Sequence, residues 1–534
     1  MLTNKAMLTA RTSFTALTTE FAPQTRRVCR GRAFRENMAD NALEKIAYEL
    51  FHAFDIRIDA ERLTDETASR LCNAQAWYFR ECLGTDEIVL CRDTRKKGEH
   101  FLQLAIDTFS ALGFHVYTNV LPVSTCQFYY SCMQRPSCAG IMYTASHNPK
   151  NYTGQKTVGP NVRPIAENVG PEGGLVAVRD AFLKGKTVSA KEGGSVTVID
   201  DGDAYVRACL DLARIGKDEL SGISVVADFL SGSAGSEVMR AFRYAGISCV
   251  PRNVVPDGNF PSGAPNPIIK DNIKGTLDYI RAHPSSVDFC FLFDGDGDRV
   301  DTRSGDGTEI SPSVIMTFLS SALTSIVPHT GEARIGIDSK ASPVVHAELK
   351  SGGNNPLLVP NGHSQIKDIL LQKKAIAAVE ETAHYYLNFP NGENTVPMES
   401  TLLFCLLFLK RWKNHRAEFD ALVARQNSVL REREWGYTYA DEKDRDDALC
   451  ATENFFTERG YVPLKTLEDG SPLGTTLLKR DWDGDKWCWI AQRASQSEKG
   501  VARWMVTSSD ADELQSAVAA INEAAQKKLH RSDV

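Results

Sequence analysis

Long hydrophobic runs and paired cysteines are missing from this 534-residue sequence. The longest apolar run, TLLFCLLFL at 401–409, has less than half of the roughly 20 residues that a membrane-spanning helix requires. The thirteen cysteines are odd in number, form no CxxC pair and are scattered along the chain, which is typical of free thiols in a reducing compartment. We therefore expect no membrane partner and a cytoplasmic location.

The sequence also lacks an excess of positive charge. Its formal net charge is -7 and its pI is near 6.0, so neither nucleic acid nor an anionic membrane is expected as the main partner. Low-complexity tracts and solenoid repeats are absent as well. With 42% hydrophobic and 24% charged residues, the chain can bury several cores, and its length predicts roughly three or four domains. A small anionic substrate would need a local basic pocket.

The first 37 residues carry seven basic and two acidic side chains and many Ser and Thr. Two interpretations stay open for this segment. One is an organelle transit peptide, which has this composition, and the other is a disordered extension, which we favour. We therefore expect residues 1–40 to be a flexible N-terminal extension, with organelle import as the alternative to a cytoplasmic location.

Short Val- and Ile-rich runs alternate with amphipathic stretches along most of the chain. The succession EIVLCRDT, EHFLQLAIDTFSALGF, HVYTNVL is a β-α-β rhythm, and it returns at GISVVADFL and at ARIGIDSKASPVVHAELK. This rhythm predicts three α/β domains at 41–200, 201–311 and 312–432. The last segment, 433–534, has strand-like KWCWIAQR and VARWMVTSS before a final helix, which predicts a smaller α+β domain.

The stretch TASHNP, residues 144–149, places a hydroxyl beside an imidazole, an amide and a proline, just after an apolar run. The proline biases Asn148 away from the helical conformation and stiffens the loop. Taken alone, Ser146 has two interpretations, an ordinary loop serine or a residue that carries chemistry. The choice depends on what the rest of the chain brings to this loop.

The stretch FLFDGDGDRV ends an apolar strand with three aspartates, Asp294, Asp296 and Asp298. The alternating glycines permit a tight loop in which three carboxylates converge on one hard cation. An EF-hand is excluded, because its loop requires Gly at the sixth position and Glu at the twelfth, where Arg299 and Gly305 stand. A solvated acidic turn is the alternative. A divalent ion held by three carboxylates keeps coordination positions open for a phosphate oxygen.

Four further stretches accompany these two: AFDIR at 53–57, NGHSQIK at 361–367, VEETAH at 379–384 and RASQSE at 493–498. Together they resemble the α-D-phosphohexomutase family, in its phosphomannomutase/phosphoglucomutase branch, over about residues 50–520. The resemblance implies four domains around a central cleft, three sharing an α/β fold and the last a smaller α+β lid. It implies interconversion of hexose 1-phosphate and 6-phosphate, with mannose and/or glucose as the sugar. It also implies a phosphoserine at Ser146, one Mg²⁺ per active site, and a hexose 1,6-bisphosphate as intermediate and activator.

The resemblance also assigns roles residue by residue. The catalytic positions are Ser146, Lys156, Arg57, His384 and His363; the metal ligands are Asp294, Asp296, Asp298 and Ser146; the substrate-binding positions are Lys340, Glu380, Thr382, Arg299, Arg493, Ser495, Gln496 and Ser497. Because Lys156 would lie beside an arginine, we expect it to have a lowered pKa and to serve as a general base. A lone histidine is more often structural, so the choice of general base among Lys156, His384 and His363 stays open.

The chain departs from the family pattern in two loops. Ser497 stands where threonine is usual and Gln496 where asparagine or glycine is usual, while Val379, Thr382 and Ala383 replace Gly, Ser and Gly. These changes keep the hydroxyl groups but lose two glycines, which leaves the preference between glucose and mannose open. One alternative is a phosphoglucosamine or phosphoacetylglucosamine mutase, against which the VEETAH loop argues. Another is a non-catalytic phosphosugar-binding protein, against which the intact serine and metal motifs argue. We expect a monomer or a dimer.

Overall fold

The computed structural model describes residues 42–284, 286–495 and 500–529. Two units are distinguished: one ends at Ile46, and the other comprises Ala47–Val534. All of the strands that the structure describes belong to the second unit. The N-terminal extension expected from the sequence lies outside the described residues. Within the described ranges, none of the helices combines the length and the apolar character needed to cross a bilayer.

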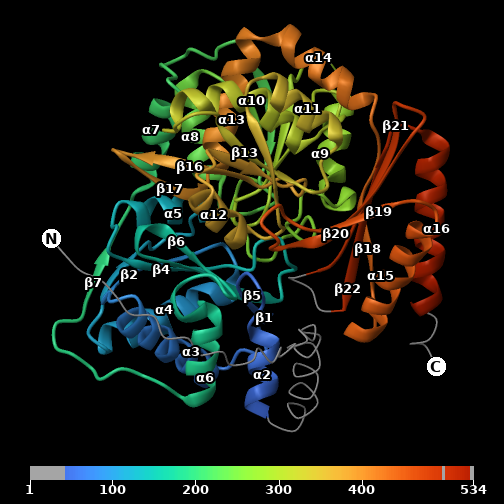
Figure 1. The fold of residues 1–534 in the computed structure, drawn as a ribbon. Helices are drawn as coiled ribbons and strands as arrows, with labels where there is room; N and C mark the ends of the chain where they lie inside the picture. The colour runs from blue at the N-terminus through green and yellow to red at the C-terminus, as the bar shows by residue number, and fades with distance from the viewer. Residues whose placement is uncertain (1–41, 285, 496–499, 530–534) are drawn as a thin grey trace, which may run out of the picture. The chain divides into compact units, whose positions relative to one another are not determined.

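Four β-sheets organise the second unit (Figure 1). The first sheet has seven strands, in the order β1-β5-β4-β2-β3-β7 with β6 paired to β5. Its strands are β1 (Ile56–Asp59), β2 (Glu87–Arg92), β3 (His115–Thr118), β4 (Ala139–Tyr143), β5 (Tyr152–Gly159), β6 (Arg163–Ile165) and β7 (Ser195–Val198). Every side chain of β4 is buried, as expected for a central strand that is covered on both faces.

The second and third sheets have five strands each, in the orders β12-β11-β10-β8-β9 and β14-β13-β15-β16-β17. The strands of the second sheet are β8 (Ser224–Asp228), β9 (Ser248–Arg252), β10 (Phe289–Phe293), β11 (Val300–Ser304) and β12 (Glu309–Ile310). Those of the third sheet are β13 (Arg334–Asp338), β14 (Asn355–Val359), β15 (Ala377–Val379), β16 (Tyr385–Asn391) and β17 (Asn394–Glu399).

These three sheets repeat one strand order. In the first sheet β2 lies between β3 and β4 and is parallel to both, and β5 is antiparallel to β4. The same places are taken by β8, β9, β10 and β11 in the second sheet and by β13, β14, β15 and β16 in the third. The third strands of this order are therefore β4, β10 and β15. The loops that follow the third strands are residues 144–151, 294–299 and 380–384. The serine, aspartate and VEETAH motifs therefore occupy the same place in three sheets. They lie beyond the carboxyl ends of parallel strands, where α/β folds bind their ligands.

The fourth sheet differs, because it is antiparallel throughout, in the order β18-β22-β21-β20-β19. Its strands are β18 (Leu430–Thr438), β19 (Val462–Thr466), β20 (Pro472–Trp482), β21 (Lys486–Ala494) and β22 (Val501–Ser508). Two helices, α15 (Glu442–Thr457) and α16 (Ala511–Leu529), pack on this sheet (Figure 1). The expected succession of three similar α/β parts and a smaller α+β part is confirmed, whereas the boundaries between them stay a prediction.

The other described helices and helical turns alternate with these strands along the chain, and α2 precedes the first strand. They are α2 (Ala42–Leu50), α3 (Asp65–Trp77), η2 (Tyr78–Cys82), α4 (Lys96–Ala111), α5 (Thr125–Met133), η3 (Pro160–Val162), η4 (Pro171–Gly173), α6 (Leu175–Lys184), α7 (Gly202–Leu212), α8 (Gly235–Ala245), α9 (Lys270–Ala282), α10 (Pro312–Ile326), α11 (Pro343–Ser351), α12 (His363–Gln372), α13 (Thr401–Asn414) and α14 (Arg416–Asn427). The apolar run at 401–409 forms the first part of α13, where it is buried against α7, α10 and α14. A helix that is apolar on every side belongs in a protein core.

Candidate active site

A cavity of about 430 Å³ collects the predicted site residues. Those that line it are Arg57, Ser146, Lys156, Arg299, Lys340, His363, Glu380, Thr382, His384, Arg493 and Ser495. The aspartates Asp294, Asp296 and Asp298 are fully buried, and their contacts with these residues include hydrogen bonds from Ser146 and Lys156. Gln496 and Ser497 lie outside the described residues. Every predicted site residue that the structure describes is therefore found in one place.

Ser146 has an uncommon backbone conformation. Its φ is 49°, in the left-handed region that costs free energy for residues other than glycine. The Ser146 amide donates a hydrogen bond of 2.8 Å to the hydroxyl of Thr144, which stabilises this turn. The Ser146 hydroxyl donates to Asp294 Oδ2 at 3.0 Å, and Nδ1 of the neighbouring His147 lies 3.3 Å from the Ser146 hydroxyl oxygen. The strained turn thus presents the hydroxyl to the first aspartate of the second sheet.

A buried arginine, Arg95, holds this loop from behind. Its guanidinium donates to the carbonyl oxygens of Ser146 at 2.7 Å, Asn148 at 2.6 Å, Pro149 at 2.7 Å and Tyr152 at 3.1 Å. Asp93, directly after β2, balances the charge through Arg95 Nε at 3.2 Å. Because the planar guanidinium has five donors in a fixed geometry, it can fix four backbone carbonyls at once. The loop position is therefore determined by a residue that precedes it by about fifty positions in the sequence.

The aspartate loop approaches the serine loop closely. A Cβ atom on Gly295 would lie 2.9 Å from the carbonyl oxygen of Ser146, so only glycine permits this approach. Gly297 has a φ of 72°, which turns the chain back between the second and third aspartates. The start of α5 supports the loop from the first sheet, since the hydroxyl of Thr125 donates to Asp296 Oδ2 at 2.6 Å.

The three aspartates fit a metal ion. One carboxylate oxygen from each lies within 4.8 Å of the others, and Oδ1 of both Asp296 and Asp298 is buried without a hydrogen-bond partner. Burial and the charges of Asp296 and Asp298 raise the pKa of Asp294 well above its ordinary value. Buried carboxylates in such a group need a cation. A set of oxygen donors without sulfur or nitrogen is the kind that Mg²⁺ prefers.

The structure corrects one expectation about Lys156. Its ammonium group contacts both Asp296, at 2.7 Å, and Asp298. Burial alone would lower the pKa of Lys156, but the two carboxylates outweigh it and raise the pKa above the ordinary value. The expected lowering is therefore wrong, because the aspartates, some 140 positions away in sequence, were not counted as its neighbours. In this arrangement Lys156 is a buried cation.

Arg57 links the first sheet to the serine loop. Its guanidinium donates to Asp55 Oδ2 at 2.6 and 2.8 Å and to the Asn148 side-chain oxygen at 2.6 Å. Asp55 also lies 3.8 Å from Nε2 of His363, at the start of α12. Burial lowers the pKa of His363 to about 4 even though Asp55 opposes this change. At neutral pH the imidazole is therefore uncharged.

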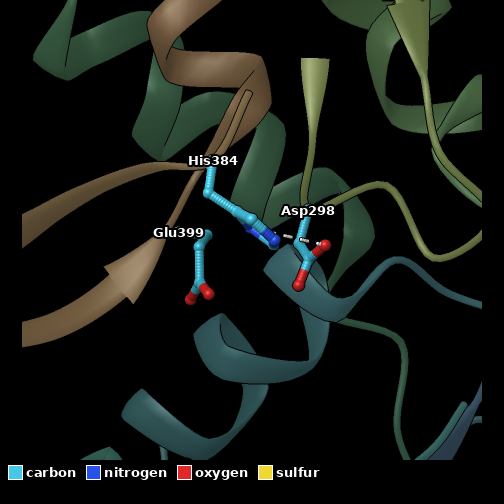
Figure 2. A group of neighbouring side chains, drawn as sticks. All are labelled: Asp298, His384 and Glu399. Carbon is cyan, nitrogen blue, oxygen red and sulfur yellow. Dashed lines mark ion pairs between the residues drawn. The ribbon is translucent and has the colours of Figure 1, made fainter. Parts of the chain in front are cut away.

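His384, in the loop after β15 of the third sheet, and Asp298, in the loop after β10 of the second sheet, point toward each other (Figure 2). His384 Nδ1 lies 3.7 Å from Asp298 Oδ1, and the carboxylate of Glu399 lies alongside them. Glu399 is fully buried and forms an ion pair of 3.0 Å with Lys367, which also donates to the hydroxyl of Tyr129 at 2.7 Å. Two lysines already balance the charge of Asp298 and Glu399, so this group serves better as a scaffold for His384 than as a second metal site.

The third sheet supplies acceptors and a cation to the cavity wall. Glu380 is buried, accepts from the Gly362 amide at 3.3 Å and from the hydroxyl of Tyr386, and lies on the same cavity wall as Thr382. Burial raises the pKa of Glu380, although Lys340 opposes this shift. The ammonium group of Lys340 lies 2.9 Å from Asp338 and donates to the Asn361 side-chain oxygen at 2.9 Å.

The fourth sheet contributes basic residues to the cavity. Arg493, at the end of β21, and Arg503, on β22, line it together with Ser495. Arg493 forms a two-point contact with Glu434 of β18, from Nε at 3.2 Å and from the terminal nitrogen at 3.1 Å. Together with Lys340, these cations form a basic region that suits a phosphate group.

The residues of this site that the sequence motifs miss include Arg95, Glu399 and Glu434. Arg95 follows the apolar run EIVLC, and charges at the carboxyl end of a predicted strand are a usable signal. Glu399 interrupts the apolar stretch VPMESTLL, where a charge must be paired if the stretch is buried. Glu434 lies in the charged stretch REREW and gives no signal of its own.

Comparisons with known proteins agree with this geometry. Two family models match: "Phosphoglucomutase/phosphomannomutase, alpha/beta/alpha domain I" over residues 49–172, and domain II of the same family over residues 186–302. A phosphomannomutase/phosphoglucomutase of Pseudomonas aeruginosa is 29% identical over 340 residues, which are 63% of this chain and 69% of that protein. An Escherichia coli phosphomannomutase is 29% identical over 347 residues, 63% of this chain and 72% of that protein. The crystal structure of a phosphoglucomutase/phosphomannomutase family protein from Burkholderia thailandensis has the same fold, with a TM-score of 0.71 and 21% identity over 90% of this chain and 97% of the other.

Proposed function

Because this chain belongs to the α-D-phosphohexomutase family, we propose that it interconverts the 1-phosphate and the 6-phosphate of mannose or glucose through a phosphoserine at Ser146. The observation that carries this proposal is the position of the Ser146 hydroxyl, 3.0 Å from Asp294 Oδ2 at the wall of a basic cavity. A hydroxyl beside a group of metal-ligating carboxylates can store a phosphoryl group between two transfers. A serine with only a structural role would have no need of a hydroxyl that is directed at a buried carboxylate on a cavity wall.

Two phosphoryl transfers complete the proposed reaction. In the first, the phosphoserine gives its phosphoryl group to the free hydroxyl of the sugar phosphate, which loses its proton, and a hexose 1,6-bisphosphate forms. In the second, the Ser146 oxygen accepts the other phosphoryl group of the bisphosphate, and the freed sugar oxygen regains a proton. We assign these proton transfers to His384 and His363, which line the cavity, and assign Lys156 the role of a fixed cation. A hexose 1,6-bisphosphate would also reload an enzyme that had lost its phosphoryl group.

The acidic group of the second sheet would hold Mg²⁺ with Asp294, Asp296, Asp298 and the serine loop. When bound, Mg²⁺ supplies positive charge that neutralises phosphoryl oxygens and orients them for in-line transfer. Arg57 and Arg299 line the wall next to Ser146, where they can bind the reacting phosphoryl group. Arg493 and Ser495 would hold the phosphate that is not reacting, and Glu380 and Thr382 the sugar hydroxyls.

The substitution Ser146→Ala tests the proposal. We expect the wild-type protein to show an added mass of one phosphoryl group after incubation with hexose 1,6-bisphosphate, and the variant to show none. Turnover should fall by about three orders of magnitude or more while sugar phosphate still binds. The exposed Ser189→Ala is the matched control and should behave as the wild type. Near-normal turnover of Ser146→Ala in the presence of the bisphosphate would contradict the assignment.

A further inference from the structure

Glu434 lies on the cavity wall among the cations that should bind phosphate. Both of its carboxylate oxygens are used by Arg493, at 3.2 and 3.1 Å, in the two-point geometry that arginine also forms with phosphate. The ammonium group of Lys340 lies 3.7 Å from Glu434 Oε1. One carboxylate from β18 thus meets a cation from the third sheet and another from the fourth.

Electrostatics keeps this carboxylate ionised. Burial alone would raise the pKa of Glu434, but the charges of Arg493, Lys340 and Arg503 outweigh burial and hold the pKa at about 2. Glu434 therefore carries a full negative charge at any pH at which the enzyme would work. The side chains of Arg493 and Glu434 are 13% and 17% exposed, so solvent screens their attraction only weakly.

Glu434 already offsets part of the positive charge that an approaching anion would meet on Arg493 and Lys340. A phosphate on the Arg493 guanidinium must either take over the edge used by Glu434 or bind the remaining edge close to a fixed negative charge. In both cases Glu434 opposes the binding of phosphate, because like charges at this separation repel in a partly desolvated site. Removing only the charge of Glu434 would leave the basic residues in place and make them more attractive to phosphate.

We propose that Glu434 is an internal competitor of the substrate phosphate for Arg493 and Lys340, an inference that rests on the proposed phosphohexomutase function. In the proposed reaction the bisphosphate releases its non-reacting phosphate, reorients and binds again with the two phosphates exchanged, and a competitor for Arg493 would favour that release. A phosphate held too tightly by Arg493 would slow this step. Glu434 acts through Arg493 and Lys340, and is thus a positioning residue that sets phosphate affinity.

Calorimetric titration with inorganic phosphate in metal-free buffer tests this inference on the full chain. We expect Glu434→Gln, which keeps the shape but removes the charge, to bind phosphate about tenfold more tightly than the wild type. Glu432→Gln, the same substitution at an exposed position two residues earlier on β18, should leave the dissociation constant unchanged. In turnover assays Glu434→Gln should lower KM for 1- and 6-phosphosugars and lower kcat as well.

The outcomes separate this inference from the function on which it rests. If wild-type protein and Arg493→Ala bind phosphate equally, the proposed phosphate site itself is wrong. If binding depends on Arg493 but Glu434→Gln binds phosphate equally or more weakly, the function stands and the competitor role is wrong, because Glu434 then only orients Arg493. Melting temperatures show whether the variants fold, and Glu434→Ala repeats the titration if the glutamine variant does not.

Discussion

Two of the histidines with a lowered pKa, His363 and His346, have surroundings that keep their side chains neutral. Burial lowers the pKa of His363 to about 4, and burial together with the charges of Lys479 and Lys350 lowers the pKa of His346, on α11, to about 4. His346 Nε2 is moreover buried without a hydrogen-bond partner. In the unfolded chain a histidine titrates near pH 6.5. Between these values the unfolded state binds more protons, so the free energy of unfolding falls as the pH is lowered from 6.5 towards 4.

His346 allows this effect to be measured away from the cavity. Between pH 7 and pH 5 we expect the wild type to lose about 1 to 2 kcal/mol more free energy of unfolding than His346→Gln, which cannot gain a proton. Melting temperatures or urea midpoints of both proteins at the two pH values provide the comparison. The exposed His100→Gln should follow the wild type. Equal acid sensitivity of His346→Gln and the wild type would show that His346 is not the group that titrates.

At the scale of elements, three loops in equivalent positions build most of the site. They follow β4, β10 and β15, and they contact one another through backbone as well as side chains. The bridge between Arg299 and His384 and the hydrogen bond from the Val300 amide to the Ala383 carbonyl at 3.0 Å join the aspartate loop to the third sheet. The aspartate loop and the loop of residues 380–384 are therefore joined through backbone contacts.

The aspartate loop should determine metal dependence. We expect Asp296→Asn to weaken Mg²⁺ binding by about tenfold or more, because it removes one charged oxygen ligand from a set of three. Excess EDTA should abolish turnover, and Zn²⁺ should be a poor substitute since no sulfur ligand is present in the group. Titration calorimetry measures the affinity. Asp306→Asn, in the exposed turn after β11, provides the control. Full turnover in EDTA would refute a metal-dependent reaction.

Sequence reasoning succeeds where the site is local and fails where it depends on distant partners. Ser146 and the three aspartates could be assigned to one site, because their two motifs and four further stretches together resemble one family, although each motif alone leaves two interpretations open. The strand rhythm likewise predicts three similar α/β parts. Arg95, Glu399 and Glu434 escape prediction, since their roles come from contacts that only the fold creates. The raised pKa of Lys156 escapes it for the same reason.

At the scale of the whole molecule, residues from four sheets share one cavity, and in the proposed reaction this would limit which sugars the enzyme can distinguish. In the proposed reaction the bisphosphate binds in two orientations. The O3 and O4 hydroxyls nearly exchange places between these orientations, whereas the substituent at C2 moves to a new position. Glu380, which has two acceptor oxygens, can therefore hold O3 and O4 both times. A fixed partner for C2 is not available in both orientations.

We therefore expect both glucose and mannose phosphates to be used, with kcat/KM values within roughly two orders of magnitude, or about 3 kcal/mol. The methyl group of Thr382 adds bulk to the sugar wall, so a 2-acetamido sugar should be a poorer substrate. Coupled assays with the 1-phosphates of glucose, mannose and N-acetylglucosamine provide the measurement. A preference for the acetamido sugar, or a gap beyond about a thousandfold between mannose and glucose, would show that the enzyme does recognise C2.

The repeated strand order of the first three sheets also bears on ancestry. Two duplications of one unit would produce such a chain, and they would deliver three copies of the same loop to one centre. Once three copies existed, each was free to take on a different task without loss of the other two. With such a history, the serine loop that follows β4, the aspartate loop that follows β10 and the Glu380–His384 loop that follows β15 would be three copies of one loop with different tasks. In that case, the different tasks of the three loops would reflect the duplication of one unit as well as the chemistry of the site.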